Sequence, residues 1–479
     1  MQNENALQVP FLPDFDKALD TRNICIAGLV FSWLLSTAFL FFGVVGLAPR
    51  HLGFKFSVPR HTASILAETL PLAVNILITA CINCLGYIHT ASLRWSLHRE
   101  NRLRFNSNLR LFTGARNGGP NSRVANAFSA FCHVLCYAGG SQILVSGRIN
   151  PMSLVFIGFG LAGEAFLSTW CLLSSNGKIL TWSSNPLNTA LVCLHNGMSH
   201  HPRRCMVPAS SQVPEKGPSA VAPSLRQPTA RSVHTDVRYI TRLLWCLAFL
   251  VICWAVTILT IKIRYTPVWE WPLTWRWSEE DTTLTIGDAD WPHQLRNLGA
   301  LLLIAAIQAF LTLGLHCAEL IVNTIRDEQI WRSASSPGPG ISLGSNSVKA
   351  AFSSWESIAL FLVKPITHWL FGLGMLYQMS RDSDSLAFRC LPLFTLGGCA
   401  FVVAVCTTWM VRISPVGPQP ATWGHVETLA DLVDDWGMGH QGKLFWGDKG
   451  VGTNGSRHAG TSDLQVLIGM IRMDYLYSG

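Results

Sequence analysis

The chain has 479 residues, of which 49% are hydrophobic and only 13% are charged, and its formal net charge is +8. Because soluble domains carry about 25% charged residues, this composition excludes an ordinary soluble protein and indicates a polytopic membrane protein. The basic residues lie in loops beside apolar segments. That pattern sets membrane orientation and argues against a nucleic-acid partner.

The first half of the chain contains four apolar segments, each with roughly the 20 residues that a bilayer core requires. The tail before them, residues 1–23, is acidic where a secretory signal would be basic, so we expect a cytoplasmic tail and no cleaved leader. The four predicted spans, which together make a first membrane region at 24–174, are 24–47, 64–88, 124–146 and 152–174.

The loop at 89–123, between the second and third predicted spans, holds seven arginines and a single acid. Arginines beside a span usually stay in the cytoplasm, so this loop predicts the orientation of every span. Its apolar residues, Leu93, Leu97, Phe105, Leu109 and Phe112, suggest a helix against the inner leaflet. Anionic lipid headgroups are then the expected partners of Arg94, Arg99, Arg102, Arg104 and Arg110.

Residues 175–242 are rich in Pro, Ser and Ala at their centre, so we expect a disordered cytoplasmic linker there. A second membrane region follows at 243–411, with predicted spans at 243–261, 298–322, 357–377 and 391–411. Its outer loop at 262–297 combines acidic residues with tryptophans. Such a loop either binds an extracytoplasmic ligand by stacking or belongs to the aromatic belt of the membrane.

The tail at 412–479 is too polar to span, and we expect it in the cytoplasm. Helical spacing predicts an amphipathic helix through Trp423, Val426, Leu429, Val433 and Trp436. LFWGDKGVG and LIGMIRMDYLY are expected to form short strands. The predicted fold is all-α: a polytopic transmembrane helix bundle of about eight spans, with both termini cytoplasmic and a small α/β-like C-terminal tail.

Polar and ionisable residues occur inside several predicted spans, where a charge costs about 2.5–3.5 kcal/mol at the helix centre. Helical spacing places some of them in stripes along the second and sixth spans. The candidate intramembrane residues are Glu68, Asn75, Thr79, Asn83, His133, Glu164, Gln308, Thr312, His316, Glu319, Lys364 and His368.

Two interpretations of these residues stay open. In the functional one, Glu164 and the His316–Glu319 pair bind an ion or relay protons along a polar pathway. In the structural one, Glu164 and Lys364 form a buried ion pair, and the stripes hydrogen-bond neighbouring helices. Polar contacts between helices are common in any bundle, which favours the structural interpretation.

No motif predicts an enzyme, a metal site or a cofactor. His316 and Glu319 reverse the Glu-x-x-His order of di-iron bundles and occur only once. GDKGVGTNG lacks the Lys-Ser/Thr pair of a phosphate-binding loop. Asn454 begins a glycosylation sequon that a cytoplasmic tail would keep unmodified; it would become available if 357–377 did not cross the membrane.

Four segments resemble a group of uncharacterised polytopic membrane proteins of filamentous fungi. They are LGLHCAELIVNTIRDEQIWR (313–332), ATWGHVETLADLVDDW (421–436), LFWGDKG followed by RHAGTSD (444–463), and SLRWSLHRENRLRFNSNLRLF (92–112). The resemblance implies a fungal multi-pass protein with a cytoplasmic tail. It implies no activity, ligand or catalytic residue.

We therefore expect a non-enzymatic membrane protein that carries or gates a small solute or ion through a polar bundle interior. The alternative is a membrane scaffold or sensor that acts through its cytoplasmic loops and tail. The two differ in whether function depends on Glu164 and Glu319 or on the tail.

Overall fold

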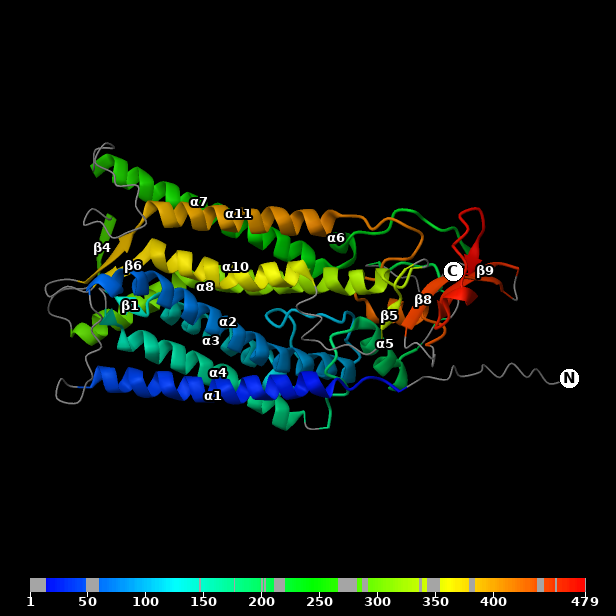
Figure 1. Ribbon diagram of the computed structural model, residues 1–479, viewed down its shortest axis with the longest axis horizontal. Coiled ribbons are helices and arrows are strands. Elements are labelled where there is room, and N and C mark those ends of the chain that lie inside the picture. Colours follow the sequence, from blue (N-terminus) through cyan, green and yellow to red (C-terminus); the bar gives the residue numbers. More distant parts are fainter. Residues whose placement is uncertain are drawn as a thin grey trace.

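In the part of the chain that the structure describes, eight long helices lie side by side and form a bundle (Figure 1). The structure is a computed structural model that is 64% helical. It describes residues 14–48, 60–145, 148–175, 177–199, 201, 204–210, 220–265, 282–286, 292–335, 338–342, 354–378, 384–436, 443–452 and 455–478. The bundle helices are α1 Leu19–Leu47, α2 Arg60–Arg99, α3 Arg123–Ser141, α4 Pro151–Ser174, α7 Thr235–Tyr265, α8 His293–Arg332, α10 Trp355–Gly374 and α11 Cys390–Arg412.

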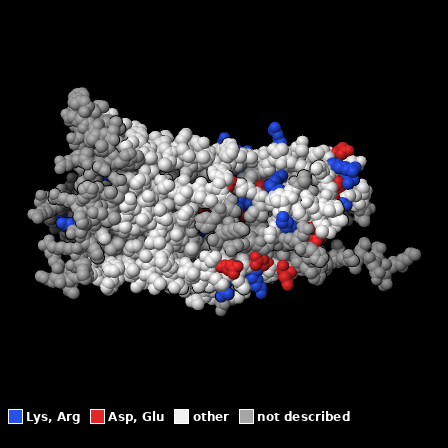
Figure 2. All heavy atoms as spheres, viewed as in Figure 1, with Lys and Arg blue, Asp and Glu red and all other residues white. Residues whose placement is uncertain are grey.

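Seven of the bundle helices in the described residues are long and apolar enough to cross a membrane, so the chain is a multi-pass membrane protein. The eighth, α3, does not meet that criterion. It covers the predicted third span and packs against α4 and α8 within the bundle. Large apolar side chains such as Leu34 and Phe249 are exposed on the bundle surface, as lipid-facing residues are. Figure 2 shows that charged residues are sparse over this part and gather at one end.

Glycine lets α4 lie in close contact with α1. A Cβ atom at Gly158 would come within 2.8 Å of the Leu40 backbone nitrogen and 3.0 Å of the Ser36 carbonyl oxygen. Small residues at such positions allow helices to approach closely in lipid. Most of the residues of α4 are buried or half-buried, in agreement with this close packing.

An extramembrane domain caps the charged end of the bundle, and we use this name for the described parts of 100–122, 177–233, 333–342 and 413–478. It contains α5 Pro186–His195, α6 Ala230–Val233, α12 Val426–Leu432 and the short 3-10 helices at Gly119–Asn121 and Gln465–Leu467. Its five-stranded sheet has the order β3 Ala220–Val221, β10 Tyr477–Ser478, β9 Arg457–Ser462, β8 Lys443–Val451 and β5 Ile341–Ser342. Strands β8 and β9 are antiparallel, whereas β10 pairs with β9 in parallel.

Two small sheets close the opposite end of the bundle (Figure 1). One pairs β1 Leu144–Val145 with β2 Arg148–Ile149. The other has the order β4 Thr282–Ile286, β7 Asp384–Phe388 and β6 Met375–Gln378. The tryptophans of the loop at 262–297 lie outside the described residues, as does Asn454.

The core of the extramembrane domain joins segments far apart in the chain. Trp95 at the end of α2 and Trp331 at the end of α8 pack with Trp446 of β8, and α5 and α12 complete the cluster. A helix of 40 residues is about 60 Å long, roughly twice the thickness of a bilayer core. α8 therefore reaches beyond the membrane and supports the domain.

The expectation of a disordered linker over 175–242 is wrong for the residues around α5. Pro186 and every following residue of the helix up to Cys193 are buried. Asn185 accepts a hydrogen bond from the Leu187 N–H and caps the helix, and Pro186 occupies the first turn, where proline is favoured. The prediction of disorder rested on the Pro- and Ser-rich centre of this segment. Residues 211–219 of that centre lie outside the described residues.

The helix expected on the inner leaflet is also wrong. Helix α2 continues without a break through Arg99, and the side chains of Leu93 and Leu97 are buried within the protein. The apolar spacing in this segment therefore reflects packing against the extramembrane domain.

The N-terminal residues before α1 lie at the same end of the bundle as the C-terminal tail. The Lys17 carbonyl accepts a hydrogen bond from the Trp182 N–H, and the Asp16 carbonyl accepts one from the Thr181 hydroxyl. Both contacts are made with the extramembrane domain. The predicted amphipathic helix of the tail is present as α12, and LFWGDKGV lies in β8. Of LIGMIRMDYLY, only Tyr477 belongs to a strand of the sheet.

Candidate functional site: a line of ionisable residues inside the bundle

Glu164 of α4 is paired with His133 of α3 in the bundle interior, and its side chain is only 1% exposed. Its Oε1 accepts a hydrogen bond from the Ser129 hydroxyl at 2.8 Å and lies 2.8 Å from His133 Nδ1. The same ring nitrogen lies 2.7 Å from the Ser129 carbonyl oxygen. Because both neighbours of Nδ1 are acceptors, this nitrogen carries a hydrogen.

A second charged group lies beside the first, on α8 and α10. Glu319 forms an ion pair with Lys364, and its Oε1 lies 3.3 Å from His316 Nδ1. Lys364 is buried, with a side chain only 2% exposed, whereas the Glu319 side chain is 33% exposed. Glu319 is thus the more accessible of the two interior carboxylates.

The two groups meet through their histidines. The rings of His133 and His316 lie edge to face with their centroids 4.6 Å apart. Within the described residues, both ring nitrogens of His316 are buried and neither makes a hydrogen bond, although Nδ1 lies 3.3 Å from Glu319 Oε1. The contact joins two carboxylates, two histidines and a lysine into one continuous line across α4, α3, α8 and α10.

A third histidine adjoins this line. His368 stacks on Tyr137 with centroids 3.7 Å apart and an interplanar angle of 13°. Its Nδ1 lies 2.9 Å from Gln308 Nε2, which can only donate, so Nδ1 accepts and a neutral ring carries its hydrogen on Nε2. That Nε2 is buried and lacks a partner among the described residues. The Tyr137 hydroxyl in turn lies 3.0 Å from Thr79 Oγ1 of α2.

The structure brings together seven of the predicted intramembrane residues. They are His133, Glu164, Gln308, His316, Glu319, Lys364 and His368. Thr79 joins them through Tyr137, whereas Thr312 donates to the Gln308 carbonyl oxygen of its own helix. Asn75 is fully buried, and Asn83 is half-buried. The side chain of Glu68 lies outside the described residues.

The predicted ion pair between Glu164 and Lys364 does not form. Each residue has a nearer partner, His133 and Glu319 respectively. The sequence analysis also missed Ser129 and Tyr137. Both lie four residues from His133 on α3 and therefore share its helical face, a signal that was available from spacing.

The arginines of the basic loop divide into buried and exposed groups. Arg94 is buried and donates from Nη1 to the Ser183 carbonyl oxygen at 2.8 Å, so it is not a headgroup ligand. Arg110 is half-buried against His89, with 3.4 Å between Nη1 and Nδ1, and Arg102 pairs with Glu100. Arg99 and Arg104 are exposed.

Two acidic residues at the end of α8 hold the extramembrane domain in place. The Asn106 side-chain amide donates to both oxygens of Asp327 at 3.1 Å. Glu328 Oε2 accepts from the backbone N–H groups of Thr422 and Trp423 at 2.8 and 2.7 Å. A Cβ at Gly424 would come within 2.6 Å of the Asp327 carboxylate, so the chain passes very close to α8 here.

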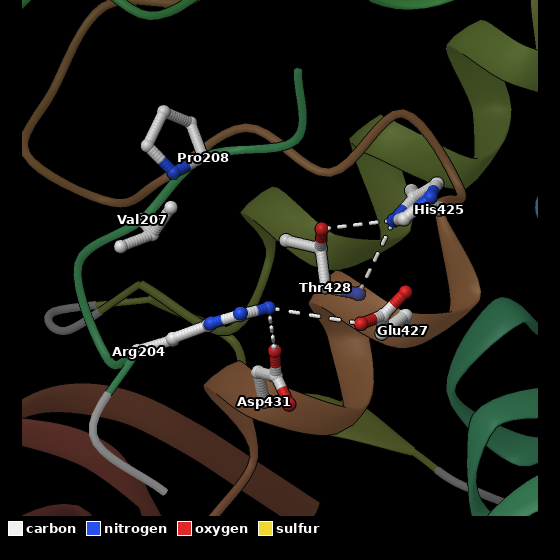
Figure 3. A pocket seen from close by; sticks show the side chains of 7 residues that line it. All are labelled: Arg204, Val207, Pro208, His425, Glu427, Thr428 and Asp431. Carbon is white, nitrogen blue, oxygen red and sulfur yellow. Dashed lines mark hydrogen bonds and ion pairs between the residues drawn. The ribbon is translucent and has the colours of Figure 1, made fainter. Parts of the chain in front are cut away.

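Figure 3 shows a small pocket in the extramembrane domain where Arg204 points toward two acidic residues of α12. Its Nη1 lies 3.7 Å from Glu427 Oε1 and 3.7 Å from Asp431 Oδ2. Burial raises the pKa of Asp431 to about 6. His201, Glu427 and Asp431 are close enough together to hold a metal ion. The guanidinium of Arg204 already supplies the positive charge, so we assign an ion-pair cluster here.

No protein-family model matches the chain, and neither does any curated protein sequence or solved structure. The fold and the site therefore define the class by themselves. The chain is a multi-pass membrane protein, with seven apolar helices in its described residues and ionisable side chains buried in the bundle interior.

Proposed function

We propose that this protein relays protons through its helix bundle, along the line from Glu164 through His133 and His316 to Glu319. Ionisable groups buried among transmembrane helices are costly, and chains of Asp, Glu and His are the usual elements of proton pathways. The observation that carries the proposal is the edge contact between the His133 and His316 rings, each of which also lies beside a carboxylate.

Histidine suits this role because it can accept a proton on one ring nitrogen and release it from the other. The unpartnered Nε2 atoms of His316 and His368 provide free positions for that exchange. In a purely structural network such atoms would be expected to have partners, since a buried unsatisfied polar group costs about 1–3 kcal/mol.

The proton is the cargo that this geometry supports best. Two links of the line are direct polar contacts, at 2.8 Å for His133 and Glu164 and 3.3 Å for His316 and Glu319, and the two histidine rings meet edge to face between them. A proton can pass between groups at such distances without separating the helices. A larger solute would have to displace these contacts.

The test is proton flux into liposomes that contain the purified full-length protein, measured with an internal pH dye under an imposed membrane potential. We expect E164Q and E319Q each to lower the flux at least tenfold, whereas E356Q leaves it unchanged. Glu356 is a matched control, because it is a buried acid at the start of α10 that bonds to Gln329. Equal flux in all four proteins would refute the relay.

We further propose that the extramembrane domain faces the cytoplasm, because the basic loop adjoins it. Of the five arginines predicted to bind anionic headgroups, Arg99 and Arg104 are then the two that are exposed. Charge reversal at both positions should weaken retention of the protein by vesicles rich in anionic lipid. Reversal of the already paired Arg102 should matter less.

A second candidate function is that of a membrane sensor. The observation that favours it is the docking of residues 422–424 onto α8 through Asp327 and Glu328. This docking ties the extramembrane domain to a bundle helix. Deleting the tail would not test it cleanly, because the tail supplies Trp446 and Leu429 to the domain core. E328Q is the better probe: a sensor predicts that it alters the host phenotype while E164Q does not.

A further inference from the structure

A thiol, an imidazole and a carboxylate meet in the extramembrane domain, from three segments that are distant in the chain. Cys205 follows α5, Asp434 follows α12, and His458 lies on β9. His458 Nε2 lies 2.9 Å from Asp434 Oδ2. Its other nitrogen, Nδ1, lies on the side of Ser478 and Cys205: Ser478 Oγ is 3.2 Å from Nδ1 and 3.3 Å from the Cys205 sulfur.

The carboxylate of Asp434 is held in place by a hydrogen bond and an ion pair. Asp434 Oδ1 accepts from the Thr461 N–H at 2.7 Å, and Oδ2 lies 3.0 Å from Lys449 Nζ. The hydrogen bond from His458 and the charge of Lys449 outweigh burial and lower the pKa of Asp434 to about 2. The aspartate is therefore ionised at any physiological pH and fixes the orientation of the imidazole ring.

The imidazole of His458, beside this ionised carboxylate, is protonated at neutral pH. Its hydrogen bond to Asp434 and, next in size, its hydrogen bond to Cys205 raise the pKa of His458 to about 9. Two further cations lie nearby and are both paired, Lys449 with Asp434 and Arg457 with Asp448. An imidazolium beside a thiol stabilises the thiolate, which is the reactive form of cysteine.

We propose that Cys205 is the nucleophile of an acyl-transfer site that exchanges with acyl thioesters, with His458 as its proton partner and Asp434 positioning the imidazole. The thiolate attacks the thioester carbonyl carbon, the bond from that carbon to the departing sulfur breaks, and the acyl group stays on Cys205 as a new thioester. The departing thiolate takes a proton from His458. The exchange needs no oxidant or reductant.

A thioester fits this site better than an amide. A departing thiolate, with a thiol pKa near 8.5, needs only a weak acid, and an imidazolium of pKa about 9 is such an acid. An amide nitrogen, unlike a thiolate sulfur, must be protonated before it can leave, so an amide would require a stronger acid. The nearby backbone N–H of Ala459 points at the sulfur itself, at 3.4 Å.

Ser478 covers the thiol. The Cys205 sulfur is buried, donates to the Ser478 carbonyl oxygen at 2.8 Å and belongs to a residue that is only 1% exposed. Tyr477, beside it, is held independently through a hydrogen bond from its hydroxyl to Asp448 Oδ2 at 2.8 Å. Removing Ser478 and Gly479 should therefore uncover the thiol while Tyr477 keeps the end of the sheet in place.

The same core supplies a matched control. Cys193 of α5 is also 1% exposed and packs in the same hydrophobic cluster as Cys205. Burial raises the pKa of its thiol to about 12. If burial alone governs both residues, they should react alike; if the imidazolium activates Cys205, it should react far faster.

The experiment incubates full-length protein and the variant truncated after Tyr477 with phenyl thioacetate, and locates the acetyl group by peptide mass spectrometry. We expect acetylation of Cys205 and not of Cys193, and at least a tenfold faster reaction after truncation. H458Q and D434N should slow it at least tenfold.

Two outcomes would overturn the proposal. One is equal acetylation of Cys205 and Cys193 in the truncated protein, which would mean that exposure is all that matters. The other is an unchanged rate in D434N, which would show that the carboxylate and the imidazole it positions do not assist the thiol. Both readouts use proteins with His458 intact, so they stand even if H458Q fails to fold. Neither depends on the proton relay.

Discussion

His133 and His316 lie edge to face with ring centroids 4.6 Å apart, although one belongs to α3 and the other to α8. Each ring is also beside a carboxylate, Glu164 or Glu319. This single contact joins the His133–Glu164 and His316–Glu319 pairs, which lie on different helices.

The Lys364–Glu319 pair should reveal the cost of leaving Glu319 without its partner. We expect K364M to destabilise the protein by less than the roughly 3–5 kcal/mol typical of a fully buried pair, because the Glu319 side chain is 33% exposed. The double variant K364M/E319Q should recover part of that loss. The measurement is a double-mutant cycle of unfolding in detergent micelles, and strictly additive effects would show that the two residues do not interact.

The close approach of α1 and α4 should depend on Gly158. G158V places side-chain atoms against the Leu40 backbone and should lower the thermal unfolding midpoint by several degrees. Gly398 of α11 is the control, since a Cβ there meets nothing within 4 Å. G398A should leave the midpoint unchanged. Equal sensitivity at both positions would contradict the packing described here.

The docking of residues 422–424 onto α8 should depend on Glu328. E328Q weakens two charge-assisted hydrogen bonds to backbone N–H groups, so we expect about 1–3 kcal/mol of local destabilisation. Limited proteolysis should then cut between residues 413 and 425 more rapidly. E427Q is a control, because the Glu427 side chain is 46% exposed. Unchanged cleavage in E328Q would argue against the docking role.

The stability of the extramembrane domain should depend on pH through the Asp434–His458 pair. The lowered pKa of Asp434, about 2, stabilises the folded state above the unfolded value near 3.9, and this contribution is lost as the pH falls toward 2. The raised pKa of His458, about 9, stabilises it below the unfolded value near 6.5, and this contribution is lost as the pH rises through 9.

The pair should therefore contribute most between about pH 4 and pH 6.5. Unfolding curves at pH 5, 7 and 9.5 should show a progressive loss of stability in the wild-type protein. D434N should flatten the alkaline part of that loss, because His458 then has no carboxylate to raise its pKa. If the wild-type protein and D434N lost the same amount of stability between pH 7 and pH 9.5, this assignment would be contradicted.

Helix positions could be predicted from the sequence because hydropathy is a local property of the chain. The eighth predicted span, 391–411, agrees closely with α11 at Cys390–Arg412. The seventh, 357–377, contained Lys364 and Pro365, yet it corresponds to α10 at Trp355–Gly374. Helical spacing, which is also local, predicted the amphipathic helix from Trp423 to Trp436, although α12 covers only the central part of that segment.

Burial outside the membrane could not be predicted in this way. The segment around α5 looked like a linker because its partners, Trp95, Trp331 and Trp446, lie far from it in the chain. Arg94 looked like a headgroup ligand for the same reason, since its acceptor is the carbonyl of Ser183. Composition over a short window does not reveal such partners.

The sequence by itself determined which residues are ionisable and at what depth of a helix they lie. It singled out Glu164, His316, Glu319 and Lys364 but paired Glu164 with the wrong partner. Only the tertiary structure decided the pairing, because it depends on the rotation of each helix about its axis and on which helices are neighbours. The same holds for Cys205, Asp434 and His458, whose approach is set by strand register and loop closure rather than by spacing in the chain.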